Sequence, residues 1–141
     1  MMVYLAADKP LREVAWRADA PGFNTTPLVP DERRVRRQFT KPCLMYAGSW
    51  EGCGCGFQLG EYPAEFQEPD EMSQKRRSLQ GFATYLREEL PRVGSIQLFA
   101  CWDGDQEAPP EHRRALTPSA LETDAFFFLQ KEFSTIGPDA G

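Results

Sequence analysis

DEMSQKRRSLQGFATYLREEL, residues 70–90, is the stretch that most strongly constrains the fold. Its apolar side chains recur at spacings of three, four and seven residues, which predicts an amphipathic helix with one apolar stripe. The stripe consists of Met72, Leu79, Phe82, Ala83, Leu86 and Leu90. We expect Asp70 to cap the beginning of this helix and Pro91 to end it.

Most other side chains of residues 70–90 are polar or charged. Lys75 and Glu89 are assigned, with their arginine and glutamate neighbours, to a solvated face opposite the stripe. Gly81 costs about 1 kcal/mol of helix stability relative to alanine. A close approach of the helix to a sheet would explain a glycine at this position.

Apolar runs on both sides of the helix predict strands. Residues 43–48, CLMYAG, are apolar at successive positions, which is typical of an interior strand covered on both faces. Residues 95–102, SIQLFACW, form a second run, and the Asp-Gly-Asp sequence at 103–105 predicts a turn after it. Further strands are expected at 3–7, 14–16 and 125–129, a helical turn at 31–37 and a short helix within 109–120. The expected fold class is α+β, with a mixed β-sheet of about four or five strands packed by one main amphipathic helix.

The length of the chain, 141 residues, fits one domain with one hydrophobic core. Hydrophobic residues make up 41% and aromatic residues 12% of it, a composition that excludes a disordered protein. We therefore expect a single globular domain over 1–141 with a frayed tail at 137–141.

The charge balance argues against nucleic acid as a partner. The chain has 16 Lys and Arg against 21 Asp and Glu, whereas nucleic-acid-binding domains are normally basic. The densest basic run, at 33–37, is expected to be a solvated face.

No apolar run reaches the roughly 18 residues of a transmembrane helix, so no membrane partner is expected. The first seven residues do not resemble a signal peptide, which predicts a cytoplasmic protein.

The order strand, helix, strand predicts which loops meet. If strands 43–48 and 95–102 are parallel neighbours with the helix crossing between them, their carboxyl ends share one edge of the sheet. Open α/β sheets bind ligands at this edge. Cys43, at the beginning of its strand, is expected near the opposite end. The candidate residues at the shared edge are Trp50, Glu51, Gly52, Cys53, Gly54, Cys55, Gly56, Cys101, Trp102, Asp103 and Asp105.

The segment EGCGCGF, residues 51–57, is the most distinctive chemical motif. The thiols of Cys53, Cys55 and Cys101 suit zinc or another thiophilic metal, with an aspartate or His112 as a fourth ligand. Cys53 and Cys55 also suit thiol redox chemistry, because a disulfide between cysteines one residue apart closes a small, easily reduced ring. A third interpretation is a structural turn with unreactive cysteines. The residues do not decide among the three.

Motifs of known catalytic and nucleotide-binding sites are missing from the sequence. The glycines at 52, 54 and 56 do not complete G-x-G-x-x-G, because Phe57 occupies the sixth position, and no P-loop sequence occurs. Gly48 and Ser49 are adjacent, which does not fit a nucleophile elbow. No cofactor is predicted, and the leading hypothesis is a non-enzymatic protein, although the sequence does not decide whether the chain is an enzyme.

These observations favour a binding or interaction domain with its site at the sheet edge that carries the 51–57 loop and the 101–105 turn. Its partner is an unidentified protein or small-molecule ligand. The candidates for contact with it are Trp50, Glu51, Gly52, Gly54, Gly56, Trp102, Asp103 and Asp105. The alternative is a thiol-dependent metal-binding or redox protein that uses Cys53 and Cys55, with Cys101 as a further candidate.

Two segments, YAGSWEGCGCGF at 46–57 and ACWDGD at 100–105, resemble segments of a set of small, functionally uncharacterised bacterial proteins. The likeness extends over most of the chain. It implies a bacterial source, and it carries no activity, cofactor or partner over to these residues.

Overall fold

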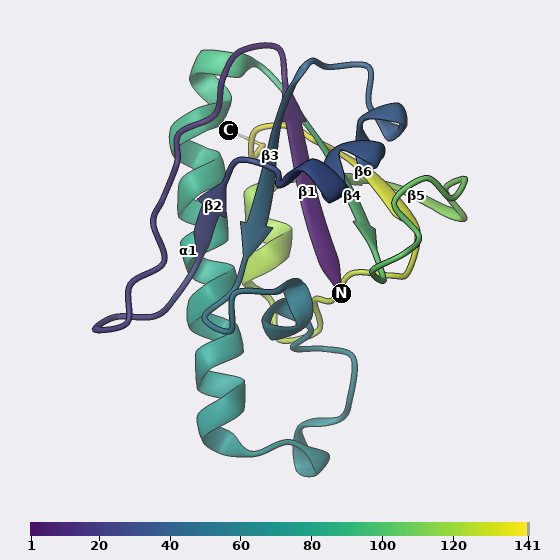
Figure 1. Cartoon of the computed structure of the whole chain (residues 1–141). Coiled ribbons are helices and arrows are strands. Elements are labelled where there is room, and N and C mark those ends of the chain that lie inside the picture. Colours follow the sequence, from purple (N-terminus) through teal and green to yellow (C-terminus); the bar gives the residue numbers. More distant parts are fainter. Residues whose placement is uncertain (141) are drawn as a thin grey trace.

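Six strands form one mixed sheet in the computed structural model, which describes residues 1–140 (Figure 1). They are β1 (Met2–Ala7), β2 (Asn24–Thr26), β3 (Cys43–Gly48), β4 (Ile96–Cys101), β5 (His112–Leu116) and β6 (Glu132–Ile136). Their order in the sheet is β2-β3-β1-β4-β6-β5. Only β5 and β6 pair in parallel, and all other neighbours are antiparallel. The α+β prediction is confirmed, with six strands instead of four or five.

The predicted main helix is confirmed as α1 (Pro69–Val93). It begins after Glu68 rather than at Asp70, with Pro69 in the first position. Proline is tolerated there because the N–H that it lacks would have no hydrogen-bond partner within the helix. The expected end at Pro91 is wrong, because α1 continues to Val93. Gly94 ends it with a φ of 83° and donates its N–H to the Leu90 carbonyl at 2.7 Å.

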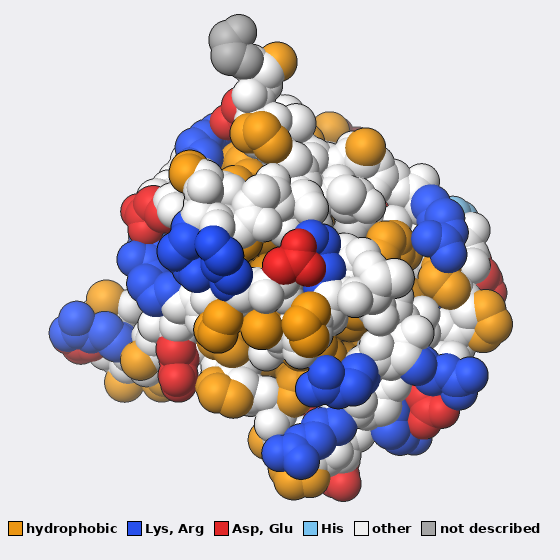
Figure 2. Space-filling model, turned by 90° about the horizontal axis from the view of Figure 1, so that it is seen from above, with side chains coloured by type: hydrophobic (Ala, Val, Ile, Leu, Met, Phe, Trp, Pro, Cys, Tyr) orange, Lys and Arg blue, Asp and Glu red, His pale blue; other side chains and the backbone are white. Residues whose placement is uncertain are grey.

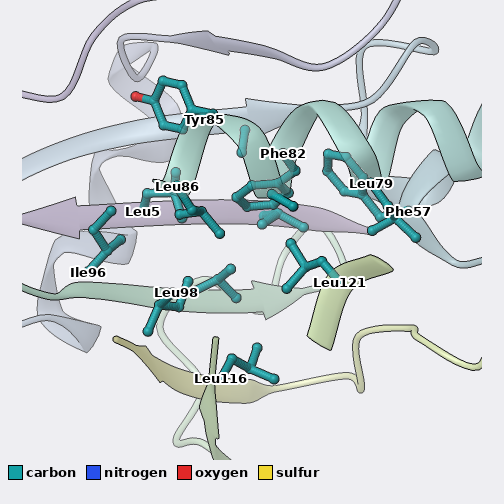
Figure 3. Packing of buried hydrophobic residues seen from close by; sticks show 14 of the residues in the cluster. Leu5, Phe57, Leu79, Phe82, Tyr85, Leu86, Ile96, Leu98, Leu116 and Leu121 are labelled. Atoms are coloured by element: carbon teal, nitrogen blue, oxygen red, sulfur yellow. The ribbon is translucent and has the colours of Figure 1, made fainter. Parts of the chain in front are cut away.

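The apolar stripe of α1 packs on one face of the sheet (Figure 3). Leu79, Phe82 and Leu86 are buried there with Leu5 of β1 and Leu98 of β4. Phe126 and Phe128, from the segment before β6, and Leu121, from the 3-10 helix η4 (Pro118–Glu122), complete this layer. Burial of such side chains stabilises the fold by about 1.5–3 kcal/mol each.

A smaller cluster covers the opposite face. Tyr4, Tyr46 and Phe99 project from β1, β3 and β4 and pack with Val35 of the 3-10 helix η1 (Pro30–Gln38). The helical turn expected at 31–37 is thus confirmed. Because both faces of β1, β3 and β4 are covered, these strands are apolar at successive positions, as the sequence indicates.

Strands expected at 14–16 and 125–129 are not formed. Val14 makes only an isolated bridge to Thr25. The apolar run 125–129 is irregular. The side-chain amide of Gln58 makes the hydrogen bonds to its backbone that a neighbouring strand would otherwise make. Gln58 accepts the Phe128 N–H and donates to the Phe128 carbonyl, both at 2.8 Å. Within 109–120, where a short helix was expected, the structure has strand β5 and then the beginning of η4.

The topological argument assumed that strands β3 and β4 are neighbours. In the structure they are not. Strand β1 lies between them and pairs with both in antiparallel orientation, through Val3 with Ala47 and Ala100. Two strands antiparallel to a third run parallel to each other, so the carboxyl ends of β3 and β4 still lie at one edge. Figure 1 shows the amino end of β1 between them.

None of the helices within residues 1–140 is both long and apolar enough to cross a membrane. The tail that was expected to fray makes contacts in its described part. Gly137 donates its N–H to the Leu116 carbonyl at 3.0 Å, and Asp139 accepts from Arg87 at 2.9 Å. The last residue of the predicted tail, residue 141, lies outside the described residues.

Candidate functional site

The loop that follows β3 is a tight turn built around Ser49. Its N–H donates to the Cys53 carbonyl at 3.0 Å, and its hydroxyl donates to the same oxygen at 2.6 Å. Gly52 donates back to the Ser49 carbonyl at 2.9 Å and has a φ of 86°, a conformation that favours glycine. The loop is therefore held by its own backbone.

Two further glycines let this loop lie against its neighbours. A Cβ atom on Gly54 would lie 2.7 Å from the Val3 side chain, and one on Gly56 would overlap the Ser49 side chain. Gly54 also donates its N–H to the Met1 carbonyl at 2.9 Å. The short 3-10 helix η2 (Gly54–Phe57) thereby brings the Cys-Gly-Cys segment to the beginning of β1.

The cysteines at this edge differ in exposure. Cys55 is exposed, Cys53 is half-buried and Cys101 is buried. Burial raises the pKa of the Cys53 thiol, and a hydrogen bond to the Cys55 side chain raises it further. Burial also raises the pKa of Cys101, to about 12. Cys43 begins β3 and so lies at the other end of that strand.

The structure gives no support to a metal site at these thiols. Within residues 1–140, no three His, Cys, Asp or Glu side chains are grouped so that they could hold a metal ion. Cys101 belongs to the cluster on the face of the sheet opposite α1, with Tyr4 and Phe99. The three cysteines that zinc would need therefore do not form a ligand set.

A cavity of about 370 Å³ lies at the predicted edge, and we call it the end pocket. The loop after β3 and the residue after β4 both contribute to it, together with the first two turns of α1 and the chain that precedes that helix. Its lining residues are Met1, Glu51, Cys55, Gln58, Glu61, Tyr62, Glu71, Lys75 and Trp102. The structure thus brings together Glu51, Cys55 and Trp102, three of the residues expected at this edge.

Two aromatic side chains of the end pocket are largely open to solvent. Trp102 is 61% exposed and Tyr62 is 59% exposed. The Trp102 backbone is nevertheless fixed, because its N–H donates to the Gln130 side chain at 2.6 Å. Exposed aromatic rings beside a cavity are typical of ligand and partner sites, since most large aromatics are buried in the core.

The charges around the end pocket are predominantly negative. Glu51, Glu61 and Glu71 line it as exposed carboxylates, against one lysine. That lysine, Lys75, is only 7% exposed, and its ammonium donates to the Gln67 side chain at 2.9 Å, with Glu71 at 3.9 Å. The expectation that Lys75 lies on the solvated face of the helix is wrong, because it is one turn from Leu79 on the buried side. The charged groups that line the pocket are therefore three carboxylates and one ammonium group, and the ammonium group is hydrogen-bonded to Gln67.

The other expected site residues have structural contacts and do not line the end pocket. The Trp50 ring lies against Gly56, and the Trp50 carbonyl accepts from Trp16 at 2.8 Å. Asp103 accepts from Gln106 at 2.8 Å and lines a different cavity, of about 430 Å³, next to η1. Asp105 accepts from Gln130 at 2.5 Å. The turn at 103–105 therefore stabilises the backbone that presents Trp102.

A larger cavity, of about 590 Å³, lies between the loop 12–23 and α1 and contains none of the expected residues. Arg12, on its rim, is paired with Glu88 at 2.7 Å. The end of the molecule opposite the end pocket is shown in Figure 2, where lysine and arginine side chains are spread in separate places with hydrophobic and acidic ones between them. Neither region shares the combination of acidic and exposed aromatic groups found at the end pocket.

Sequence reasoning missed the other six lining residues, Met1, Gln58, Glu61, Tyr62, Glu71 and Lys75. The turn-rich composition of 60–69 gave no sign that Tyr62 stays exposed beside a cavity. For Lys75 a signal was present, because its spacing of four and seven residues from Leu79 and Phe82 continues the apolar stripe toward the amino end of the helix.

Compared with known proteins, the chain matches no family model, no curated protein and no solved structure.

Proposed function

We propose that this protein is a binding domain whose end pocket receives a positively charged group, either a small organic ammonium compound or a lysine side chain of a partner protein. The observation that carries this proposal is the pairing of two exposed rings, Trp102 and Tyr62, with three carboxylates around a cavity of about 370 Å³. A volume of this size suits a small ligand or one side chain.

The chemistry of the lining favours a cation over an anion. An ammonium group near an indole or phenol ring is attracted by about 0.5–2 kcal/mol. Carboxylates at Glu51, Glu61 and Glu71 add attraction that weakens as salt increases. Lys75 offsets only part of this attraction, because one ammonium group stands against three carboxylates.

Choline and its uncharged isostere 3,3-dimethylbutan-1-ol test the proposal, since they have nearly the same shape and differ in charge. Each is titrated into the full chain while NMR follows the indole N–H signal of Trp102. Choline should shift this signal with saturation, and the isostere should shift it far less. A lysine-containing tetrapeptide forms a second arm, and tighter binding of the peptide than of choline identifies a partner protein as the source of the cation.

Two variants and two matched controls locate the effect. Trp102→Ala and Glu51→Gln should each weaken choline binding several-fold, as measured by calorimetry, because Trp102→Ala removes the NMR signal. Trp16→Ala removes another exposed tryptophan, and Glu13→Gln another exposed glutamate, both outside the pocket. Equal shifts with choline and the isostere, or equal losses in variants and controls, would refute the proposal.

We also propose a cytoplasmic location. All four cysteines are free in the structure, which suits a compartment where thiols stay reduced. Fractionation of cells that produce the full chain tests this, and recovery from the medium or a periplasmic fraction would contradict it.

A further inference from the structure

We infer that the end pocket also exchanges thiols: Cys55 attacks a small disulfide that carries ammonium groups, and Cys53 then displaces the captured half. This inference rests on the proposed function, because the same carboxylates and rings would attract the cationic disulfide. It adds a covalent step that binding alone does not require.

The first step is placed at Cys55 by exposure. Of the four cysteines it is the one that is exposed, and its side chain lines the end pocket with Trp102 and Glu51. The Met1 nitrogen donates to the Cys55 sulfur at 3.1 Å. A disulfide bound in the pocket would therefore meet this sulfur before any other.

The second step is placed at Cys53 by proximity. Cys53 is half-buried and lies two residues from Cys55, in the turn that Ser49 and Gly52 close. Burial and the neighbouring sulfur raise the pKa of Cys53, so this thiol keeps its proton while Cys55 reacts. Gly54 keeps the two close to β1, because a larger residue would collide with Val3.

The reaction balances without a metal or a further oxidant. The Cys55 thiolate forms a bond to one sulfur of the disulfide RSSR, the S–S bond of RSSR breaks, and RS⁻ leaves and takes a proton from water. Cys53 then loses its proton to water and attacks the Cys55 sulfur, and the second RS⁻ leaves. Two protein thiols are oxidised to one disulfide and one RSSR is reduced to two RSH. The small ring of a Cys-Gly-Cys disulfide makes this step readily reversible.

Charge selects the substrate. The probes are cystamine, which carries two ammonium groups, the neutral bis(2-hydroxyethyl) disulfide and the anionic dithiodiglycolate. For each probe, the rate of thiol exchange with the folded chain is divided by the rate with the same chain unfolded in urea. This ratio corrects for differences in intrinsic reactivity among the probes. The folded chain should prefer cystamine over dithiodiglycolate by about tenfold at low salt, and the preference should fall as salt is added.

Mass spectrometry of acid-quenched samples gives the order of steps. In Cys53→Ser the reaction should stop with one aminothiol attached to Cys55, whereas the original chain should pass on to an internal disulfide without attached aminothiol. Cys55→Ser should lose most of the fast reaction, and Cys43→Ser, a half-buried cysteine elsewhere, should lose none. Peptide mapping of the unsubstituted chain, quenched early in the reaction, identifies the first cysteine to carry the aminothiol without relying on a variant.

Fast reaction in Cys55→Ser, a first adduct on any other cysteine, or preference for dithiodiglycolate would overturn the inference. Choline binding is measured on the unsubstituted chain in parallel. If this chain binds choline and does not exchange with cystamine, the thiol step alone fails. If neither binding nor exchange is seen, the proposed function fails with it.

Discussion

Phe57 anchors the loop of the end pocket in the core, and its removal should destabilise the whole protein. It is buried at the end of η2, and its ring centre lies 5.2 Å from that of Phe82, 6.1 Å from Phe128 and 6.3 Å from Phe23. Truncation of a buried phenylalanine to alanine costs about 3–5 kcal/mol, partly through loss of aromatic pairs worth about 0.5–1.5 kcal/mol each. We therefore expect Phe57→Ala to lower the free energy of unfolding by about 4 kcal/mol.

This loss is large beside the total stability of about 5–15 kcal/mol that domains have. It should lower the thermal midpoint by on the order of 10 °C. Urea unfolding followed by circular dichroism measures the free energy directly, provided that the slope with urea is unchanged.

Phe66 provides a matched control nine residues further along the chain. It also lies in a 3-10 turn, η3 (Ala64–Phe66), but it is 78% exposed. Phe66→Ala should change the free energy of unfolding by no more than about 0.5 kcal/mol. A cost below about 1 kcal/mol for Phe57→Ala, or equal costs for the two variants, would show that the loop is not anchored through this ring.

Three further outcomes follow from contacts already described. Gly56→Ala should destabilise the fold by about 1–3 kcal/mol in urea unfolding, because its new methyl group would overlap a serine side chain. Hydrogen bonds from Ser119 and Arg87 lower the pKa of Asp139 to about 2. Since this pKa is lower in the folded than in the unfolded chain, the contribution of Asp139 is present above about pH 4 and lost toward pH 2, so the stability difference between the original chain and Asp139→Asn should disappear over that range. Cys101, with a pKa raised to about 12, should resist iodoacetamide at pH 9 until the chain is unfolded, which mass spectrometry of the labelled peptide would show.

The sequence predicts the parts of the fold in which one periodicity dominates. The stripe around Leu79 and Phe82 identifies α1, and apolar runs identify the central strands. Strand β6 was missed because its inward side carries Glu132 and Ser134, both buried. Glu132 is accommodated by an ion pair with Arg114 at 2.7 Å, a contact that hydrophobic periodicity does not register.

The candidate site was predictable to the extent that strand direction places loops. Helix α1 between two strands placed Glu51, Cys55 and Trp102 at one edge, and this holds although β1 separates those strands. The rest of the lining depends on tertiary contacts. Tyr62 lies in an irregular segment held by Gln67, which donates to the Leu59 carbonyl at 2.9 Å and to the Tyr62 carbonyl at 2.7 Å.

The central position of β1 also bears on how the chain folds during synthesis. This strand is made first, yet its partners are β3, about forty residues later, and β4, nearly a hundred residues later. The middle of the sheet therefore cannot close until Cys101 has been added, and the apolar β1 has to stay unpaired until then. Pairings this distant in sequence slow folding, so we expect slow refolding for a domain of this size and a need for protection of β1 while the chain is incomplete.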